Sequence, residues 1–279
     1  MKNVLVFNLT PRLWMLHYSA QFCNELSKTH NVTVVIADYY DWFLYDKNIK
    51  LIKIKTNPKL ISFFFETLAF WNHITLLKNI KRTKPDIIHF IDNHPRYIFY
   101  WKLFKKQWYK IYVTQHDPVL HSWDSKWLLW KVASYVNYTL RNLADKLVVH
   151  WDKLKDEVIK LYKIKKNKVI SVPHGNYNFF TKRSKWLKVK NNYFLFFWRI
   201  SEYKWLDTLL ESLKFIKEQI SNFKLIIAGW WDLTQYNDLI NSNREGIEVY
   251  NYNIPEEEVY KYFEQSEFVV LPYKDATWS

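Results

Sequence analysis

The chain has 279 residues, of which 49% are hydrophobic and 24% charged, and its formal net charge is +14. This composition excludes a disordered chain, and the length predicts one or two globular domains. The positive charge favours anionic partners such as nucleotides, anionic lipid headgroups or nucleic acid. AT-rich coding, which enriches Lys, Asn, Ile, Tyr and Phe, explains the positive charge at least as well. The single cysteine, Cys23, excludes an internal disulfide and a multi-cysteine metal site.

Glycine is scarce and tryptophan is abundant. The chain holds 3 Gly and 15 Trp, whereas average usage predicts roughly 20 Gly. Several tryptophans follow predicted strands, at turns where a positive φ or a close backbone approach favours glycine: Trp14, Trp151, Trp230, Trp231 and Trp278. Some bacterial lineages read UGA as glycine and others as tryptophan. We hypothesise that many of these codons mean glycine in the source organism; a true Trp-rich homologue is the alternative.

The first half of the chain alternates strands and helices. A helix at 15–27 follows a loop that ends at Trp14, and a charged helix is predicted at 152–162. A strand, loop, helix and strand at this spacing form a βαβ unit, which implies a parallel sheet. The strands are predicted at 3–8, 32–37, 51–54, 85–94, 110–114, 144–150 and 168–172.

Polar residues end two of these strands. Asn93 lies in the polar end of the strand at 85–94, and Gln115, His116 and Asp117 follow the strand at 110–114. Because α/β proteins place ligands at the C-terminal ends of parallel strands, we expect a binding site here. A histidine at a strand end also serves as a structural hydrogen-bonding group.

Two segments combine aromatic and basic residues. An amphipathic helix within 58–84 could lie on a membrane surface or pack on the sheet, and 97–110 has the same character. The longest apolar run, 60–71, is interrupted by Glu66 and is too short to span a bilayer. The N-terminus shows no secretory signal. We expect a cytoplasmic protein, with peripheral contact to the inner face of the membrane left open.

The second half repeats the alternation after a basic segment. Residues 176–192 are predicted to be a solvated linker between a first Rossmann-like domain at 1–175 and a second at 193–279. The second domain is predicted to contain elements at 193–197, 205–220, 225–228, 233–240, 247–250, 255–265 and 268–271.

Two cations stand five positions apart between the strand at 193–197 and the following helix. They are Arg199 and Lys204. The N-terminus of a helix offers free N–H groups and a partial positive charge, so it binds phosphate well. An Arg and a Lys at that place can bind a diphosphate and neutralise the charge of a departing one.

Residues 196–206, Phe-Phe-Trp-Arg-Ile-Ser-Glu-Tyr-Lys-Trp-Leu, resemble the donor-phosphate loop Gly-Arg-x-x-x-x-Lys-Gly of retaining glycosyltransferases of the GT-B fold, family 4. Trp198 and Trp205 replace its two glycines. The resemblance implies an α/β fold of two doubly wound parallel-sheet domains, the second incomplete. It also implies transfer of a hexose from a nucleotide diphosphate sugar to an envelope lipid or glycan hydroxyl, with retention of configuration. Arg199, Lys204 and the helix N-terminus would make a metal or other cofactor unnecessary.

The resemblance extends along the chain. The stretch from Thr114 to His121 resembles Thr-x-His-Asp-x-x-x-His, whose first histidine lies near the reacting sugar, so His116 is implied as the acceptor-side catalytic residue with Asp117 as its partner. The first loop of the family faces the inter-domain cleft, which implies a place there for Trp14. Further similarities imply cleft-loop roles for Asn93 and Gly175 and donor-binding roles for Gly229, Ile254 and Thr277.

Members of the family run on by roughly another third, and that part carries a carboxylate that binds sugar and ribose. We therefore expect residues 1–279 to be an inactive fragment. The competing hypothesis is a non-catalytic binder of anionic lipid or nucleic acid, in which the tryptophans are genuine. The cations and aromatics form no recognised nucleic-acid module, so we expect no nucleic-acid partner.

Overall fold

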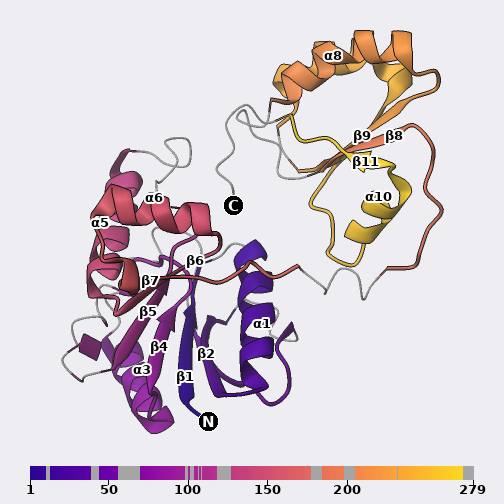
Figure 1. Cartoon of the computed structure of the whole chain (residues 1–279). Helices are drawn as coiled ribbons and strands as arrows, with labels where there is room; N and C mark the ends of the chain where they lie inside the picture. The colour runs from indigo at the N-terminus through magenta and orange to yellow at the C-terminus, as the bar shows by residue number, and fades with distance from the viewer. Residues whose placement is uncertain are drawn as a thin grey trace. The chain divides into compact units, whose positions relative to one another are not determined.

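The computed structural model describes residues 1–10, 13–38, 44–55, 70–97, 100, 104–105, 107, 109–117, 127–176, 184–197, 205–230 and 232–272. The chain divides into two compact units, one ending at Asn176 and the other running from Tyr177 to Trp278 (Figure 1). The division lies one residue after the predicted end of the first domain.

The first unit is built on a seven-stranded sheet in the order β3-β2-β1-β4-β5-β6-β7, in which every pair is parallel. Val4 of β1 pairs with Val32 of β2 on one side and with Ile87 of β4 on the other. The predicted βαβ organisation is confirmed. The strands are β1 (Asn3–Asn8), β2 (Asn31–Ala37), β3 (Lys50–Ile54), β4 (Ile87–Phe90), β5 (Lys110–Thr114), β6 (Lys146–Val149) and β7 (Val169–Ser171).

The strand order reverses between β1 and β4. From β1 the chain proceeds outward to β2 and β3, then returns to β4 on the other side of β1. Such a reversal opens a crevice at the carboxyl ends of the two strands, where α/β proteins bind ligands. Figure 1 shows α1 (Leu13–Ser27) on one face of the sheet and α3 (Phe70–Thr83) and α5 (Trp127–Leu143) on the other. The helix α6 (Asp152–Tyr162) connects β6 to a 3₁₀ turn (Lys166–Lys168) and β7.

Aromatic side chains fill much of the first core. Phe7 of β1 lies within 6.4 Å, centroid to centroid, of Tyr97, Tyr100 and Phe104, all of which are buried. Leu76 and Ile80 of α3 join the same core. These members of the aromatic segments therefore pack on the sheet, which was the alternative to membrane contact. Residues 56–69 lie outside the described part, and contact with a membrane stays a prediction.

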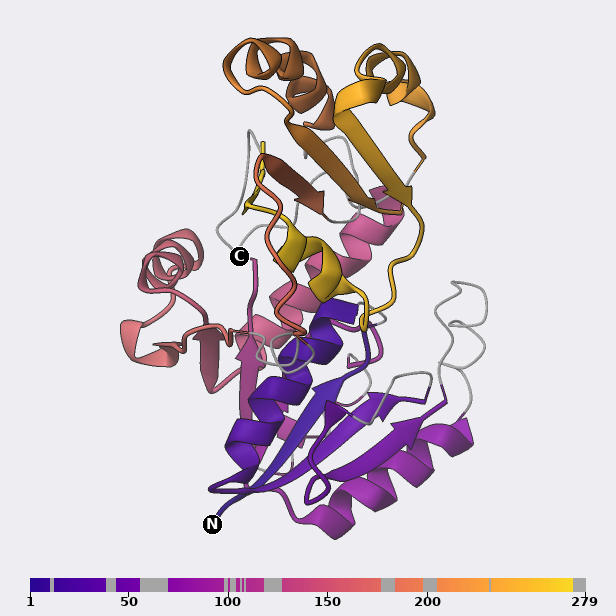
Figure 2. The ribbon, with the colours of Figure 1, turned by 90° about the vertical axis from the view of Figure 1, so that its right-hand side faces the viewer.

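The second unit contains a four-stranded parallel sheet in the order β10-β9-β8-β11, made of β8 (Tyr193–Phe197), β9 (Lys224–Gly229), β10 (Ile247–Asn251) and β11 (Phe268–Val269). The helices α8 (Leu206–Gln219) and α9 (Asn237–Ser242) lie on one face and α10 (Val259–Gln265) on the other (Figure 2). Short 3₁₀ turns occupy Thr234–Tyr236 and Arg244–Gly246. The strand order reverses at β8, so this half is doubly wound too.

Three details differ from the sequence prediction. Trp14 lies in the first turn of α1 and not in the preceding loop. The last helix begins at Val259 and not at Pro255, because the preceding residues form a turn in which the N–H of Glu258 donates to the carbonyl of Pro255 at 2.8 Å. The predicted linker is solvated over less of its length than expected, since residues 184–192 are bonded to α10 and its C-terminal neighbours.

Those bonds are made by the backbone of the basic segment. Leu187 donates its N–H to Glu264 Oε2 at 2.9 Å and Lys190 donates to the carbonyl of Gln265 at 2.9 Å. Asn192 donates to Glu267 Oε2 at 2.7 Å. Residues 184–192 therefore belong to the second unit.

Within the described residues, no helix is long and apolar enough to cross a membrane.

Candidate active site

Three histidines from distant parts of the chain meet at the carboxyl edge of the first sheet. His116 follows β5, His150 follows β6 and His174 follows β7. One nitrogen from each lies within 4.8 Å of the others. Parallel strands that end at the same edge bring these residues together across 58 positions of chain (174 − 116). Of the three, the sequence had singled out His116 alone.

His116 is the buried centre of this histidine cluster. Its Nε2 contacts the carbonyl oxygen of Ile91 at 2.9 Å, and its Nδ1 contacts His150 Nε2 at 3.1 Å. His150 Nδ1 in turn contacts the carbonyl of Val172 at 3.2 Å. Both ring nitrogens of His116 are thus engaged away from Asp117, which the sequence had suggested as its partner; the partner in the structure is His150.

Aromatic rings surround the cluster. Trp14 stands edge-on to His116, with ring centroids 5.2 Å apart. Tyr18 of α1 contacts His116 at 4.8 Å and His150 at 5.2 Å. Trp151 stacks on His174 at 6.3 Å. Trp14 therefore lies beside His116, while its expected place in an inter-domain cleft stays a prediction.

The environment keeps His116 and His150 uncharged. Burial, and after it the neighbouring His150, lower the pKa of His116 to about 3. Burial also lowers the pKa of His150 to about 4. Both imidazoles are neutral at pH 7, so His116 can donate or accept a hydrogen bond there but is not a proton-donating acid.

Asp92, which the sequence did not single out, links the chain that follows β4 to the chain that follows β1. Its Oδ2 accepts the N–H groups of Leu9 at 3.0 Å and Thr10 at 2.6 Å, and the hydroxyl of Tyr97 donates to its Oδ1. The signal in the sequence was an acidic residue at the end of a predicted apolar strand. Asn93, the predicted cleft residue, follows it and is half-buried.

Gly175 lies against α1. A Cβ added at this residue would stand 2.2 Å from Oε1 of Gln21. The Gln21 amide donates from Nε2 to Oδ1 of Asn176 at 3.0 Å, which fixes the chain as it leaves the first unit. The predicted cleft-loop residue is thus packed beside the helix that carries Trp14.

On the donor side the structure places the flanks of the predicted phosphate loop. β8 ends at Phe197 and α8 begins at Leu206, at the point where the strand order of the second sheet reverses. Trp205 occupies the N-cap of α8 with φ 52° and ψ 46°. This left-handed conformation is the one that glycine adopts without cost. Trp198, Arg199 and Lys204 lie outside the described residues.

The remaining donor-side predictions are partly placed. Gly229, the last residue of β9, has φ 146°, which a side chain rarely permits. Ile254 is half-buried and packs against the core formed by Leu195, Ile226, Ala228 and Tyr262. Trp230 is exposed. Thr277, Trp231 and Trp278 lie outside the described residues.

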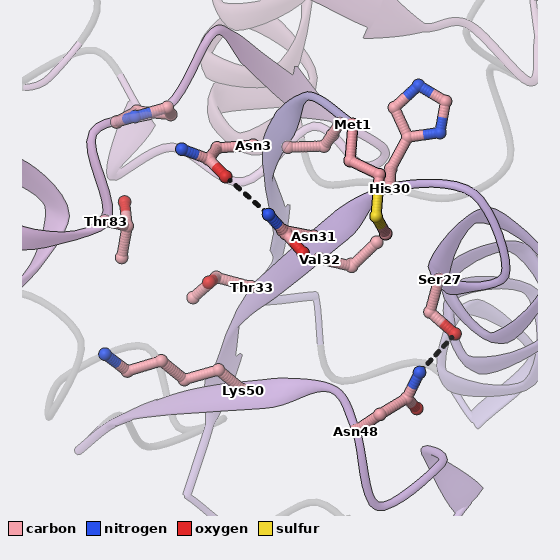
Figure 3. Close-up of a pocket in the computed structure, with 12 residues that line it drawn as sticks. Met1, Asn3, Ser27, His30, Asn31, Val32, Thr33, Asn48, Lys50 and Thr83 are labelled. Atoms are coloured by element: carbon pink, nitrogen blue, oxygen red, sulfur yellow. Dashed lines mark hydrogen bonds between the residues drawn. The ribbon is translucent and has the colours of Figure 1, made fainter.

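A hollow of about 360 Å³ lies at the opposite, amino-terminal edge of the first sheet (Figure 3). Polar groups on its wall pair with each other: Asn31 Nδ2 donates to Asn3 Oδ1 at 3.0 Å, and Asn48 Nδ2 donates to Ser27 Oγ at 3.2 Å. These pairs already satisfy the groups concerned, and strands of this fold class bind ligands at their carboxyl ends. We therefore place the candidate site at the histidine edge.

Solved structures share this architecture. A glycosyltransferase from Rickettsia africae matches with a TM-score of 0.65 and 16% identity over 97% of this chain and 72% of its own. The catalytic domain of starch synthase IV from Arabidopsis thaliana, bound to ADP and acarbose, matches with a TM-score of 0.67, 10% identity and coverages of 98% and 78%. UDP-GlcNAc 2-epimerase from Methanocaldococcus jannaschii matches with a TM-score of 0.63 and 15% identity over 95% of this chain and 77% of its own. At these identities the likeness shows the fold alone.

The two doubly wound units define a protein of the GT-B fold class. The sequence profile of Glycosyltransferase Family 4 matches residues 17–176, more than half of the chain, and the profile of Glycosyl transferases group 1 matches residues 178–277. The chain therefore belongs to Glycosyltransferase Family 4. Among curated proteins no sequence matches it.

Proposed function

We propose that this protein transfers a hexose from a nucleotide diphosphate sugar to a hydroxyl acceptor with retention of configuration. The observation that carries the proposal is the junction of β8 with α8, at the point where the strand order of the second sheet reverses. There the free N–H groups of a 14-residue helix follow the strand end at Phe197 after eight intervening residues. Arg199 and Lys204 lie in that interval.

The donor diphosphate would bind at this helix N-terminus. Arg199 offers a planar, bidentate guanidinium and Lys204 a compact point charge, and together they would neutralise the charge that develops on the departing nucleoside diphosphate. This role needs no metal at the phosphates. Gly229 and Ile254 would lie beside the nucleotide, and Thr277 near the sugar.

His116 would act on the acceptor side by position and not by charge. Since its imidazole is neutral at pH 7, it would hold a sugar or acceptor hydroxyl by a hydrogen bond. Its Nδ1 is the available atom if the contact with His150 is exchanged for substrate, because Nε2 is anchored on Ile91. Nucleoside diphosphate would depart and the acceptor would attack on the same face of the sugar.

The acceptor is proposed to be an envelope lipid or glycan, reached from the cytoplasmic side of a membrane. Support comes from the basic balance of the chain and from the glycan ligand, acarbose, on the Arabidopsis relative. No observation favours the non-catalytic binder as a second function.

The test is nucleotide binding and turnover. We expect UDP or ADP to bind the protein as measured by calorimetry, and expect Arg199→Ala and Lys204→Ala each to weaken binding by tenfold or more. Lys166→Ala, in an exposed turn of the first unit, is the matched control. Unchanged affinity in both loop variants would remove the donor-site assignment.

Product analysis separates transfer from other reactions on this fold. Incubation with nucleotide sugars and glycan acceptors, followed by proton NMR of the anomeric signals, should show a new glycosidic bond of the donor's configuration, a result that would also overturn the expectation that residues 1–279 are inactive. An inverted product, or an epimerised nucleotide sugar without transfer, would contradict the proposal. If indoles at 198 and 205 fill the phosphate site, Trp198→Gly with Trp205→Gly should increase nucleotide affinity.

A further inference from the structure

The histidine cluster holds more nitrogen ligands than acceptor positioning needs. His116, His150 and His174 come from three different strand ends, and one nitrogen of each lies within 4.8 Å of the others. Three histidines from separate elements are also the protein ligand set of several catalytic zinc sites. The contacts around these rings show how the nitrogens are used.

The hydrogen bonds around His116 and His150 leave two nitrogen lone pairs facing each other. Carbonyl oxygens only accept, so His116 donates to Ile91 through Nε2 and His150 donates to Val172 through Nδ1. A neutral imidazole has a single N–H. His116 Nδ1 and His150 Nε2 therefore both present lone pairs, although they lie 3.1 Å apart. The two lone pairs repel each other in this arrangement, and a positive species at the junction would remove the repulsion.

A shared proton is one candidate for that species, and a metal cation is the other. Metal coordination requires neutral imidazoles whose ligating nitrogens present lone pairs. Two such nitrogens face each other here, and a nitrogen of the third histidine lies within 4.8 Å of them. The cluster therefore offers three nitrogens to a cation that binds lone pairs.

The distances suit a transition metal. With metal–nitrogen bonds of about 2.0–2.1 Å, two nitrogens at this separation subtend about 100° at the metal, near a tetrahedral angle. The third nitrogen has to approach to about 3.3 Å to complete such a site. His174 is the least buried of the three, so a change of its side-chain rotamer can supply that movement.

The outer contacts have the form found around bound metals. A ligating histidine usually donates its other ring N–H to a backbone carbonyl or carboxylate, which fixes the tautomer. His116 and His150 do so to Ile91 and Val172, and His174 Nδ1 contacts the carbonyl of Gly175 at 3.0 Å. An all-nitrogen set inside a ring of aromatics suits Zn²⁺, Ni²⁺ or Cu²⁺ and not Mg²⁺ or Ca²⁺.

We propose that His116, His150 and His174 form a tri-histidine site for a divalent transition-metal cation, with one coordination position open to water or substrate. The site lies wholly in the first unit, whereas Arg199 and Lys204 belong to the second part of the sequence, so the proposed cation does not replace them at the donor phosphates. A bound cation would join the ends of β5, β6 and β7. It would also occupy Nδ1 of His116, the atom proposed above to hold a hydroxyl, so it would either present a metal-bound water there or block the acceptor.

The test uses the untagged full chain and Co²⁺ as a spectroscopic stand-in for Zn²⁺. Titration should give the visible absorption of four-coordinate Co²⁺ at one equivalent per chain, and Zn²⁺ should displace it. Calorimetry with Zn²⁺ should give the same stoichiometry, and Mg²⁺ should give no heat of binding. Cys23 is buried and burial raises its pKa to about 12, so it does not offer a competing thiolate.

Variants assign the ligands. His174→Gln removes the least buried nitrogen and is expected to leave the fold intact; it and His150→Gln should each weaken Zn²⁺ binding by at least tenfold. His30→Gln, at a histidine outside the cluster that contacts Thr29, is the control and should bind as the parent does. Zn²⁺ should raise the unfolding temperature of the parent and not of His174→Gln.

Three results would overturn the proposal. They are the absence of a Co²⁺ band at one equivalent, Zn²⁺ affinity that is unchanged in His174→Gln and His150→Gln, and ¹⁵N NMR of the metal-free protein that shows a protonated His116–His150 pair at pH 7. The last result would assign the junction to a shared proton.

Discussion

The carboxylate of Asp92 accepts the backbone N–H of Thr10 at 2.6 Å, which ties the carboxyl end of β4 to the chain that leaves β1. The same oxygen accepts the N–H of Leu9, and Tyr97 donates its hydroxyl to the other oxygen. These bonds satisfy the backbone donors of Leu9 and Thr10, which lie beyond the end of β1 at Asn8. Asp92 thereby positions the loop that leads into α1 and Trp14.

Asp92→Ala is expected to lower the free energy of unfolding by roughly 2–4 kcal/mol, since it removes the acceptor of the Thr10 N–H and of the Tyr97 hydroxyl and one of the two acceptors of the Leu9 N–H. Asp92→Asn keeps one carbonyl oxygen and should cost less. Urea denaturation at pH 7 measures both. Equal stability of the alanine variant and the parent would show that the loop finds other partners.

The same carboxyl group gives a pH dependence of a defined sign. Burial raises the pKa of Asp92 to about 6, against the opposing effect of its hydrogen bonds, while the unfolded value is about 3.9. Between these values the folded state binds more protons, so this group makes stability fall as pH rises from about 4 to 6, by roughly 3 kcal/mol in all. Denaturation at pH 4.5 and pH 7 should show that component in the parent and not in Asp92→Asn.

His89 should act in the opposite direction. It is fully buried, its Nε2 contacts the hydroxyl of Thr114 at 2.8 Å, and burial lowers its pKa to about 3. The unfolded histidine titrates at about 6.5. Below that value the unfolded state binds more protons, so stability is lost as pH falls from about 6.5 toward 3.

His89→Gln should therefore lose less of its pH 7 stability on acidification than the parent does, and its acid unfolding midpoint should lie at a lower pH. Acid titration followed by near-UV circular dichroism measures this. His30→Gln, in an accessible turn, is the control and should keep the parent midpoint. A parent-like acid midpoint for His89→Gln would show that other buried groups set the acid limit.

The fold was predictable because its signals are local. The runs Val32 to Ala37 and Leu225 to Ala228 are strands whose apolar residues are all buried, and helical spacing in Leu206, Leu209, Leu210 and Leu213 marks the buried face of α8. Alternation of such runs implies parallel sheets without any knowledge of distant contacts. The ends of β8 and α8 were therefore placed within one residue.

The site was less predictable because its contacts are long-range. His116 was expected beside Asp117, its neighbour in sequence, but its partner is His150, 34 positions away. Only the strand order β5-β6-β7 brings these ends together, and a motif in one segment carries no information about it. The bonds that attach Leu187 and Asn192 to the second unit were invisible for the same reason.

The tryptophan hypothesis receives mixed support from the backbone. Trp205 and Trp186 both have φ 52°, where glycine is favoured, although Trp186 had not been singled out. Trp151 has φ −141° and Trp14 lies in a helix, so neither needs the freedom of glycine. Reading the codons is the direct test of the recoding hypothesis. The backbone conformation separates the tryptophans into those with a left-handed φ and those with an ordinary one.

Those groups make different predictions for replacement by glycine. A left-handed conformation costs a non-glycine residue roughly 1–2 kcal/mol, so Trp186→Gly, at an exposed position, should raise the free energy of unfolding by about 1 kcal/mol. Trp205→Gly should also raise the free energy of unfolding, but by less, because it removes the packing contacts of a half-buried indole. Trp151→Gly should give no gain. Thermal unfolding of all three settles the order, and a Trp151→Gly protein as stable as Trp186→Gly would contradict it.

Gly229 provides the complementary case, in which a glycine is required. Its φ of 146° at the end of β9 is a conformation that residues with a Cβ rarely adopt. Gly229→Ala should destabilise the second unit by roughly 1–3 kcal/mol and distort the chain that leads to Trp230. Differential scanning calorimetry, which resolves the two units where they unfold separately, measures the effect.

Gly175→Ala is the matched comparison, because Gly175 has no positive φ and its added Cβ would meet only the end of the Gln21 side chain. Its cost should be smaller and should largely disappear when Gln21→Ala is introduced as well. No second substitution of a side chain should rescue Gly229→Ala, since its strain lies in the backbone. If Gly229→Ala cost no more than Gly175→Ala, the turn after β9 would have to relax to an ordinary φ without loss, and Gly229 would lose its assigned place in shaping the donor side.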